Sequence, residues 1–170
     1  MKDGPRFVRW INDPAVSKTL RGHHKRLTLK EENKWIKGLK KRRKTEKQFS
    51  IDTAEGVHIG SIGLHIHVDG RVATFGILIG DKNYWGKGYG FAATKLLMQY
   101  ALSDLKLHKV ELGVFAFNAR GIALYKKIGF KIEGVRKEHL FYQGKYHDEI
   151  LMGLFAGRRL GNKMPSIKVE

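Results

Sequence analysis

Three glycines, Gly86, Gly88 and Gly90, stand within five residues in the segment YWGKGYG, directly ahead of a run with helical spacing over residues 91–105. A backbone without side chains at a helix N-terminus allows several N–H groups to converge on an anion such as a phosphate. The spacing matches neither the G-x-G-x-x-G of dinucleotide-binding folds nor a P-loop, because no Gly-Lys-Ser/Thr follows. The glycines therefore predict a phosphate-binding turn, with a tight turn that binds nothing as the alternative.

Two side chains further along could move protons. Tyr125 lies in an expected helix over residues 119–128, and its phenol, with an ordinary pKa of ~10, stays protonated at neutral pH and can donate a proton. Glu111 lies on an expected strand over residues 109–115 and could accept a proton through a water molecule. Simple core packing for Tyr125, and a solvent-facing or salt-bridged position for Glu111, are the structural alternatives.

Three histidines are candidates for contacting a substrate. His65 and His67 lie two residues apart and share one face of an expected strand, which would suit two metal ligands. The sequence indicates no third ligand, so we expect no metal and favour a polar lining of the substrate cleft. His147 stands beside the turn at residues 143–145 and could hold the acceptor, although an exposed hairpin explains it equally well.

The elements that must position these side chains predict one α/β domain. Helical spacing and cap residues predict helices, and alternation predicts strands, in the order helix, helix, three strands, helix, strand, helix, two strands. This order indicates a mixed, mostly antiparallel sheet flanked by helices. Thr28 and Glu31 have capping-box spacing, and the helix after them is expected to bury an apolar face that contains Leu29 and Trp35.

Length and composition limit the class of protein. The 170 residues suit one domain, which we place at residues 1–156, followed by a basic C-terminal tail at 157–170. The absence of cysteine excludes disulfides, thiolate metal sites and a cysteine nucleophile, and it fits a reducing compartment. The sequence shows neither a membrane-spanning segment nor the apolar core of a signal peptide, so we expect a cytoplasmic protein without a membrane partner.

The chain is strongly basic, with 33 Lys and Arg against 16 Asp and Glu and a net charge of +17. Such a charge attracts phosphates, nucleic acid and anionic cofactors. The densest run is KGLKKRRKTEK at residues 37–47, in which only Glu46 is acidic. A solvated helix end explains this run, and a surface that faces RNA or the ribosome is the functional alternative.

The glycine segment and a second motif together resemble the GNAT superfamily of acetyl-CoA-dependent N-acetyltransferases. The family's loop has the form Arg/Gln-x-x-Gly-x-Gly/Ala, which this chain shows as Trp85-x-x-Gly88-x-Gly90. The family then carries an asparagine and a helix that ends L-Y-x-K-x-G-F, which this chain shows as Asn118 and residues 124–130. Further segments are similar to the ribosomal-protein N-terminal and spermidine acetyltransferase subgroup, at residues 10–14, 60–64 and 144–152. The resemblance spans nearly the whole chain.

The resemblance implies acetyl-CoA as cosubstrate and assigns roles to residues. Main-chain groups of residues 75–79 would pair with the pantetheine arm, residues 85–90 would hold the pyrophosphate, and Asn118 would contact the cofactor arm. Tyr125 would protonate the leaving sulfur, with Glu111 as the candidate base. The implied cofactor-binding set is Phe75, Ile77, Leu78, Ile79, Trp85, Gly86, Lys87, Gly88, Tyr89, Gly90, Asn118 and Lys126, and the substrate-binding set is His65, His67 and His147.

Three features depart from the family pattern. Only residues 1–5 precede the first expected helix, so the first edge strand is missing or very short. Trp85 stands where the family has Arg or Gln, which leaves the pyrophosphate mainly to main-chain donors and Lys87. Thr74 stands where the subgroup often has an acidic residue, so no strong general base is evident there.

These observations favour a protein N-terminus as the acceptor, as in the ribosomal-protein acetyltransferases. An α-amino group has a pKa of ~8 and a polyamine nitrogen one of ~10.4, so deprotonation at neutral pH costs the polyamine about 3 kcal/mol more. The +17 charge should also repel a polyamine. An amino-sugar nucleotide or a polyamine remains the alternative acceptor, and a non-catalytic module that binds CoA or RNA on the same fold is the alternative class. We expect a monomer or homodimer.

Overall fold

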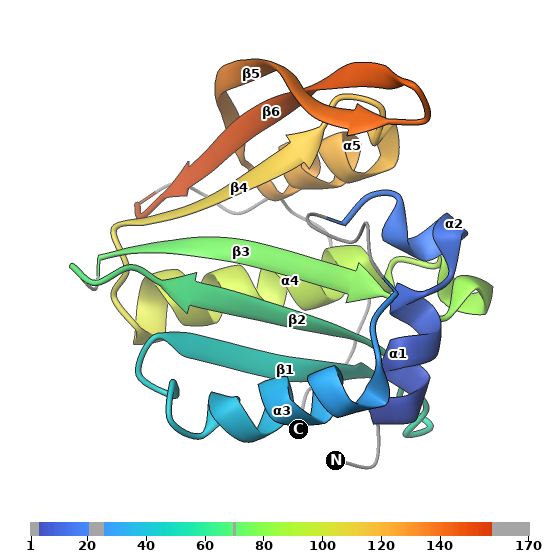
Figure 1. The fold of residues 1–170 in the computed structure, drawn as a ribbon. Helices are drawn as coiled ribbons and strands as arrows, with labels where there is room; N and C mark the ends of the chain where they lie inside the picture. Colours follow the sequence, from blue (N-terminus) through green and yellow to red (C-terminus); the bar gives the residue numbers. More distant parts are fainter. Residues whose placement is uncertain (1–3, 21–25, 70, 158–170) are drawn as a thin grey trace.

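The computed structural model describes residues 4–20, 26–69 and 71–157, which form a six-stranded sheet with helices on both faces (Figure 1). The strands are β1 Glu46–Asp52, β2 His58–Ile66, β3 Val72–Ile79, β4 Lys109–Phe115, β5 Lys131–Tyr142 and β6 Lys145–Phe155. Their order across the sheet is β1-β2-β3-β4-β6-β5, and of these pairs β3–β4 is parallel while the others are antiparallel. The predicted α/β architecture with a mixed, mostly antiparallel sheet is confirmed.

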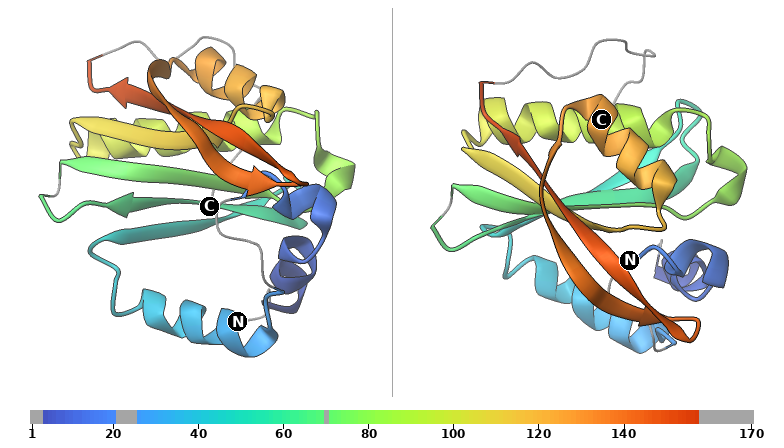
Figure 2. Two further views of the ribbon diagram at one scale, coloured as in Figure 1. Left: turned by 45° about the horizontal axis from the view of Figure 1, so that its top comes forward. Right: turned by 90° about the horizontal axis from the view of Figure 1, so that it is seen from above.

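The described residues also form the α-helices α1 Gly4–Ile11, α2 Pro14–Ser17, α3 Leu29–Leu39, α4 Tyr89–Gln99 and α5 Ala119–Ile128. Helices α4 and α5 lie on one face of the sheet, and α1 to α3 lie on the other (Figures 1 and 2). Asp13, Thr28 and Asn118 cap α2, α3 and α5, each by accepting a hydrogen bond from a first-turn N–H group. Glu31 completes the predicted capping box at Thr28.

Apolar side chains fill the layer between the sheet and the helices α4 and α5. Leu64, Val110 and Leu154 of three strands have no exposed surface, and neither do Met98 of α4 and Ile128 of α5. Each such side chain contributes about 1.5–3 kcal/mol by leaving water, so the two helices are fixed firmly against the strands. A second, smaller cluster joins α1 and α2 to β3 and contains Trp10, Ile11, Val16 and Leu78.

The parallel strands β3 and β4 pair over three residues, from Val72 to Thr74, and then separate (Figure 1). Among the described residues no strand pairs with β3 on that side beyond Thr74. The carbonyl of Val72 accepts a hydrogen bond from His67 of β2, and main-chain groups alternate in direction along a strand. Phe75 and Ile77 therefore direct their N–H and C=O groups toward the separation, where they are available to another molecule.

Helix α3 differs from the expected amphipathic helix. Its buried residue is Glu32, at 5% exposed, whereas Leu29 and Trp35 are 43% and 41% exposed. At about 100° per residue, these two apolar side chains lie about 60° to either side of Glu32, so they flank the inward stripe. Burial raises the pKa of the Glu32 carboxyl above its ordinary value.

Other boundaries agree in part with the sequence. The helix expected over residues 91–105 begins at Tyr89, ends at Gln99 and continues into a wider π turn at Tyr100–Asp104. Helix α1 begins at Gly4, the first described residue, so the prediction of a missing or very short first edge strand concerns residues outside the described ranges and stays a prediction. The proposed tail after residue 156 lies almost wholly outside the described residues. Among the helices described, none has the length and hydropathy needed to cross a membrane.

Candidate active site

A glycine turn follows β3 and opens α4. Gly86 and Gly88 have φ angles of 75° and 89°, in the left-handed region that favours glycine, and Gly88 is the N-cap of α4. A Cβ at either position would meet nothing within 4 Å, so backbone conformation, not crowding, requires glycine here. Among the described residues no side chain caps this helix, and its first-turn N–H groups have no intrahelical or side-chain partner there. The turn therefore has the geometry of an anion-binding site.

Two cations lie on aromatic rings beside the glycine turn. The Trp85 indole N–H donates a 2.7 Å hydrogen bond to the carbonyl of Ile79, which fixes the ring at the end of β3. The guanidinium of Arg120, in the first turn of α5, lies 4.7 Å from the centre of that ring. The Lys87 ammonium lies 5.4 Å from the centre of the Tyr84 ring. Both arrangements are cation–π contacts, and the first connects α5 to the turn.

Tyr125 packs beside the point where β3 and β4 separate. Its ring stands edge-to-face against Phe75, the first β3 residue beyond the parallel pairing, with ring centroids 5.9 Å apart. It also packs against Phe130 at 6.0 Å. Burial raises the pKa of Tyr125 to about 12, so the hydroxyl keeps its proton throughout the neutral range.

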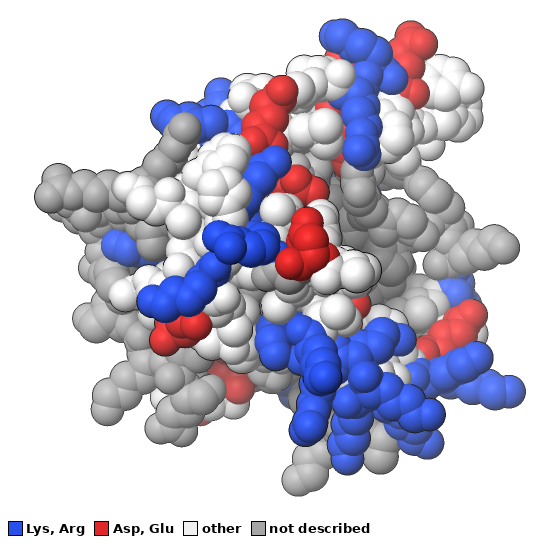
Figure 3. Space-filling view, turned by 90° about the vertical axis from the view of Figure 1, so that its left-hand side faces the viewer, with Lys and Arg blue, Asp and Glu red and all other residues white. Residues whose placement is uncertain are grey.

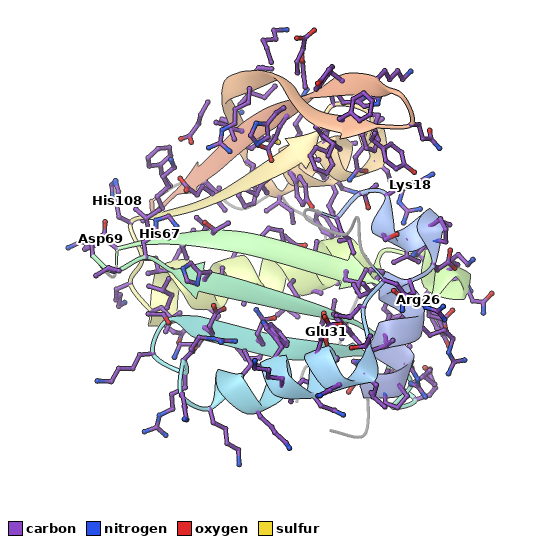
Figure 4. All side chains as sticks on the ribbon, in the orientation of Figure 1. Lys18, Arg26, Glu31, His67, Asp69 and His108 are labelled. Carbon is purple, nitrogen blue, oxygen red and sulfur yellow. The ribbon has the colours of Figure 1, made fainter. Side chains whose placement is uncertain are left out.

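A row of polar side chains lies beside Thr74 on the face of the sheet opposite to Tyr125. Thr74 is on that face because it and its neighbour Phe75 point to opposite faces. The Thr74 hydroxyl lies 2.9 Å from Nε2 of His67, which is 3.9 Å from one carboxylate oxygen of Glu111 (His67 is labelled in Figure 4). The other oxygen of Glu111 is 3.1 Å from the Lys109 ammonium, which also pairs with Glu133 at 2.7 Å. Burial alone would lower the pKa of Lys109, but its hydrogen bonds to Glu133 and Glu111 raise it.

Comparison with known protein families identifies the family to which the fold belongs. The family model described as the acetyltransferase (GNAT) domain matches residues 1–131. The chain belongs to the GNAT acetyltransferase family. The prediction made from the glycine loop and the Asn118 motif is thereby confirmed.

Individual relatives carry related names. The spermidine N(1)-acetyltransferase of Escherichia coli (strain K12) is 34% identical over 120 residues, which cover 68% of this chain and 62% of that protein's length. The probable N-acetyltransferase YjcK of Bacillus subtilis (strain 168) is 30% identical over 139 residues, or 80% of this chain and 72% of that protein. The structure of the Vibrio cholerae spermidine N-acetyltransferase with CoA and spermine has a TM-score of 0.83 at 24% identity, covering 91% of this chain and 90% of that one.

Most of the predicted cofactor residues of this GNAT chain surround the separated strands. A Cβ on Gly90 would lie 3.7–4.0 Å from side-chain atoms of Leu124, Ile79 and Ile77, so the first turn of α4 meets α5 and β3 at this point. Trp85 is bonded to Ile79, and the main-chain groups of Ile77 face the separation. The glycine turn, β3 and α5 thus form one continuous site.

Four other predicted cofactor residues have separate surroundings. The side-chain oxygen of Asn118 caps α5 at 3.0 Å, and no described residue accepts a hydrogen bond from its amide nitrogen. Tyr89 begins α4 with its ring edge-on to Tyr84, and Lys126 is exposed in the last turn of α5. The prediction for Leu78 needs correction, because its side chain is buried in the cluster on the opposite face and its main chain pairs with β2.

The three predicted substrate histidines do not converge. His65 lies 2.9 Å from Glu46, and its ring is 6.1 Å from that of His67. His147 instead lies 4.9 Å from the ring of Phe117 near the β5–β6 hairpin, and no contact between described residues joins it to the other two. No group of three or more His, Asp or Glu side chains in the described ranges is arranged to hold a metal ion. The absence of a metal remains a prediction.

Two site residues were missed from the sequence. Arg120 occupies the first turn of a helix, where the helix dipole disfavours a positive charge, and this position was a usable signal for an anionic partner. Lys109 precedes Glu111 by two residues on a strand, so the two side chains share a face and their ion pair was foreseeable. Glu133, the second partner of Lys109, comes from a strand whose placement the sequence does not reveal.

Proposed function

We propose that this protein transfers an acetyl group from acetyl-CoA to a primary amine. The observation that carries the proposal is the separation of β3 and β4, with the glycine turn at its open end and Tyr125 beside its start. Main-chain groups of Phe75 and Ile77 lie between these two places. Membership of the acetyltransferase family supports the same activity.

The residues present fit the diphosphate and the pantetheine arm of acetyl-CoA. The first-turn N–H groups of α4 and the positive end of that helix suit the diphosphate, and Gly86 and Gly88 leave open space beside them. Phe75 and Ile77 can pair with the amide groups of pantetheine as an added strand would. Bound there, acetyl-CoA would supply a thioester whose carbonyl carbon accepts the amine nitrogen and whose sulfur departs.

The two faces of the sheet would handle the protons of the reaction. An ammonium must lose one proton before its nitrogen attacks, and Glu111 with His67 can receive that proton through water. As the C–N bond forms and the C–S bond breaks, Tyr125 would donate its proton to the sulfur. The proton that the nitrogen loses on becoming an amide balances the one that Tyr125 gives.

We favour a polyamine as the acceptor. Spermidine acetyltransferases are among the relatives, and the carboxylates of Glu111 and Glu133 share the single ammonium of Lys109. One of these two carboxylate charges is therefore left without a cation near the place proposed for the acceptor amine. An ammonium group of the substrate would pair with it. The protein N-terminus expected from the sequence has no comparable support from the relatives.

The second candidate acceptor is an amine that belongs to, or lies beside, a negatively charged molecule, because one surface of the protein is strongly basic. Figure 3 shows Lys and Arg side chains gathered over the end of α3 and the turns that lead into β1. No described carboxylate pairs with any of the basic residues at positions 37–47. This basic face would suit RNA, and with it an N-terminus at the ribosome or the phosphates of an amino-sugar nucleotide.

The acceptor panel that tests these proposals measures CoA release from acetyl-CoA with spermidine, spermine, an amino-sugar nucleotide and peptides with free N-termini. A kcat/KM at least about tenfold higher for a polyamine supports the first candidate, since this ratio reflects differential transition-state binding. Preference for the nucleotide or a peptide supports the second. Binding of CoA without turnover of any amine would overturn acetyl transfer and leave a non-catalytic module.

A further inference from the structure

Arg120 is held at the glycine turn by an unusual set of contacts. Its guanidinium lies 4.7 Å from the centre of the Trp85 ring, and that ring is fixed by its hydrogen bond to Ile79 at the end of β3. Trp85 stands three residues before Gly88, the N-cap of α4. The stack therefore brings a cation from the first turn of α5 to the segment that leads into the first turn of α4.

The stability of α5 does not explain this cation. A positive charge in the first turn of a helix interacts unfavourably with the helix dipole, and Asn118 already caps α5. In the described part of the chain no carboxylate pairs with Arg120. Its side chain is exposed, where a flexible acidic side chain is easily accommodated. A guanidinium stacked on an aromatic ring keeps its N–H edge free for planar, two-point hydrogen bonding to a phosphate.

We propose that Arg120, positioned by Trp85, binds a phosphate group of CoA and supplies the cation that the Arg form of the family's loop has at position 85. This inference rests on the proposed function, because it assumes that CoA occupies the glycine turn. It explains how tryptophan is tolerated at position 85, since the indole provides a platform and the charge comes from α5 instead. The diphosphate and the 3′-phosphate share the chemistry that Arg120 recognises.

The test is the equilibrium binding of CoA, measured by calorimetry on the whole protein without an acceptor amine. Arg120→Gln is expected to weaken CoA binding roughly tenfold or more, as loss of a charge-assisted hydrogen bond implies. Arg120→Lys should recover only part of the affinity, because an ammonium lacks the planar stacking edge. The matched control is Lys131→Gln, which removes one exposed cation from the start of β5 and should leave CoA affinity unchanged.

A rescue variant separates phosphate binding from a structural role. Trp85→Arg combined with Arg120→Gln restores the family's residue and should return CoA affinity to within about threefold of the parent if one cation is what the site needs. Binding of dephospho-CoA, which lacks the 3′-phosphate, shows which phosphate Arg120 contacts. If Arg120→Gln still binds dephospho-CoA more weakly than the parent does, Arg120 contacts the diphosphate. If the two proteins bind it equally well, Arg120 contacts the 3′-phosphate. Kinetically, the KM for acetyl-CoA should rise while kcat stays within about twofold.

Failure of this inference is distinct from failure of the proposed function. If the parent protein binds CoA and Arg120→Gln, with parental thermal stability, binds it equally well, the role of Arg120 is overturned while acetyl transfer stands. If the parent does not bind CoA at all, both are overturned. Weak binding by Arg120→Gln that the double variant fails to rescue, together with a lowered Tm, would assign Arg120 to packing and also overturn the inference.

Discussion

Replacing Tyr125 with phenylalanine separates its packing from its chemistry, because the ring against Phe75 and Phe130 is kept and only the hydroxyl is lost. If the hydroxyl protonates the leaving sulfur, Tyr125→Phe should lower kcat by about 10²-fold or more, the usual contribution of a positioned acid. CoA affinity should stay within about threefold. Single-turnover acetyl transfer and calorimetric CoA binding check the two values, and a parental kcat in the variant would remove Tyr125 from the mechanism.

The pKa of Tyr125 gives a second prediction, for stability against pH. Its folded-state pKa of about 12 lies above the ordinary value of 10.0, so the folded protein holds this proton more tightly than the unfolded chain. The resulting stabilisation is complete below pH ~10 and is lost as the pH rises through ~12, by up to about 3 kcal/mol. Urea unfolding between pH 9 and 12 should therefore show a steeper loss in the parent than in Tyr125→Phe. Parallel curves for the two proteins would contradict the raised pKa.

The candidate proton donor and the candidate proton acceptor show what the sequence could and could not predict about single residues. Tyr125 could be proposed as an acid from the sequence because it stands inside a motif whose spacing is local. Thr74 was expected to provide no strong base, and its hydroxyl lies against His67, which in turn approaches Glu111 of the next strand. That grouping depends on the register of three strands, and register comes from turn geometry and long-range contacts that no local pattern contains.

The strands that form the site were predictable as elements but not in their pairing. Strand β4, Lys109–Phe115, was predicted with the boundaries that the structure has, and β3, Val72–Ile79, is likewise a run of strand-forming residues with clear ends. Their parallel pairing over three residues, which creates the site, has no signature in either run. Helix α4 shows the converse, since its apolar spacing continues past Gln99 while its geometry changes to a π turn.

The glycine turn gives a prediction at the scale of the element. Gly88→Ala forces a Cβ into a left-handed backbone with φ of 89°, which should lower the free energy of unfolding by about 1 kcal/mol and displace the first turn of α4. CoA affinity should fall with it. Gly56→Ala is the matched control, because Gly56 has φ of 77°, equally open surroundings and a place in the distant β1–β2 turn. Equal CoA affinity in the two variants would show that the turn does not bind the cofactor.

At the scale of the molecule, the basic face and the glycine turn lie at opposite ends of the sheet. Glu46, the next-to-last residue of the basic run, pairs with His65, whereas Ile79, which precedes the glycine turn, pairs with Gly60. Five residues of β2 separate those positions, or about 17 Å at the rise of a strand. Exposed charges are largely screened beyond about 8 Å at physiological ionic strength. The basic face therefore contributes little to holding CoA at the turn, and its charge needs another partner.

Binding of single-stranded RNA tests whether the basic face has that partner. Replacing Lys40, Lys41 and Lys44 with glutamine removes three exposed cations, and Lys106, Lys131 and Lys145 to glutamine is the control with the same change in net charge. If the basic face binds phosphates, the first variant should lower the slope of log K against log salt by about 2, while the control changes it little. Fluorescence anisotropy of a labelled RNA across salt concentrations measures both slopes. Equal decreases of this slope in the two variants would mean that RNA binding responds to net charge alone. Acetyl transfer to small amines should be the same in both variants as in the parent, because neither set of lysines lies in the site.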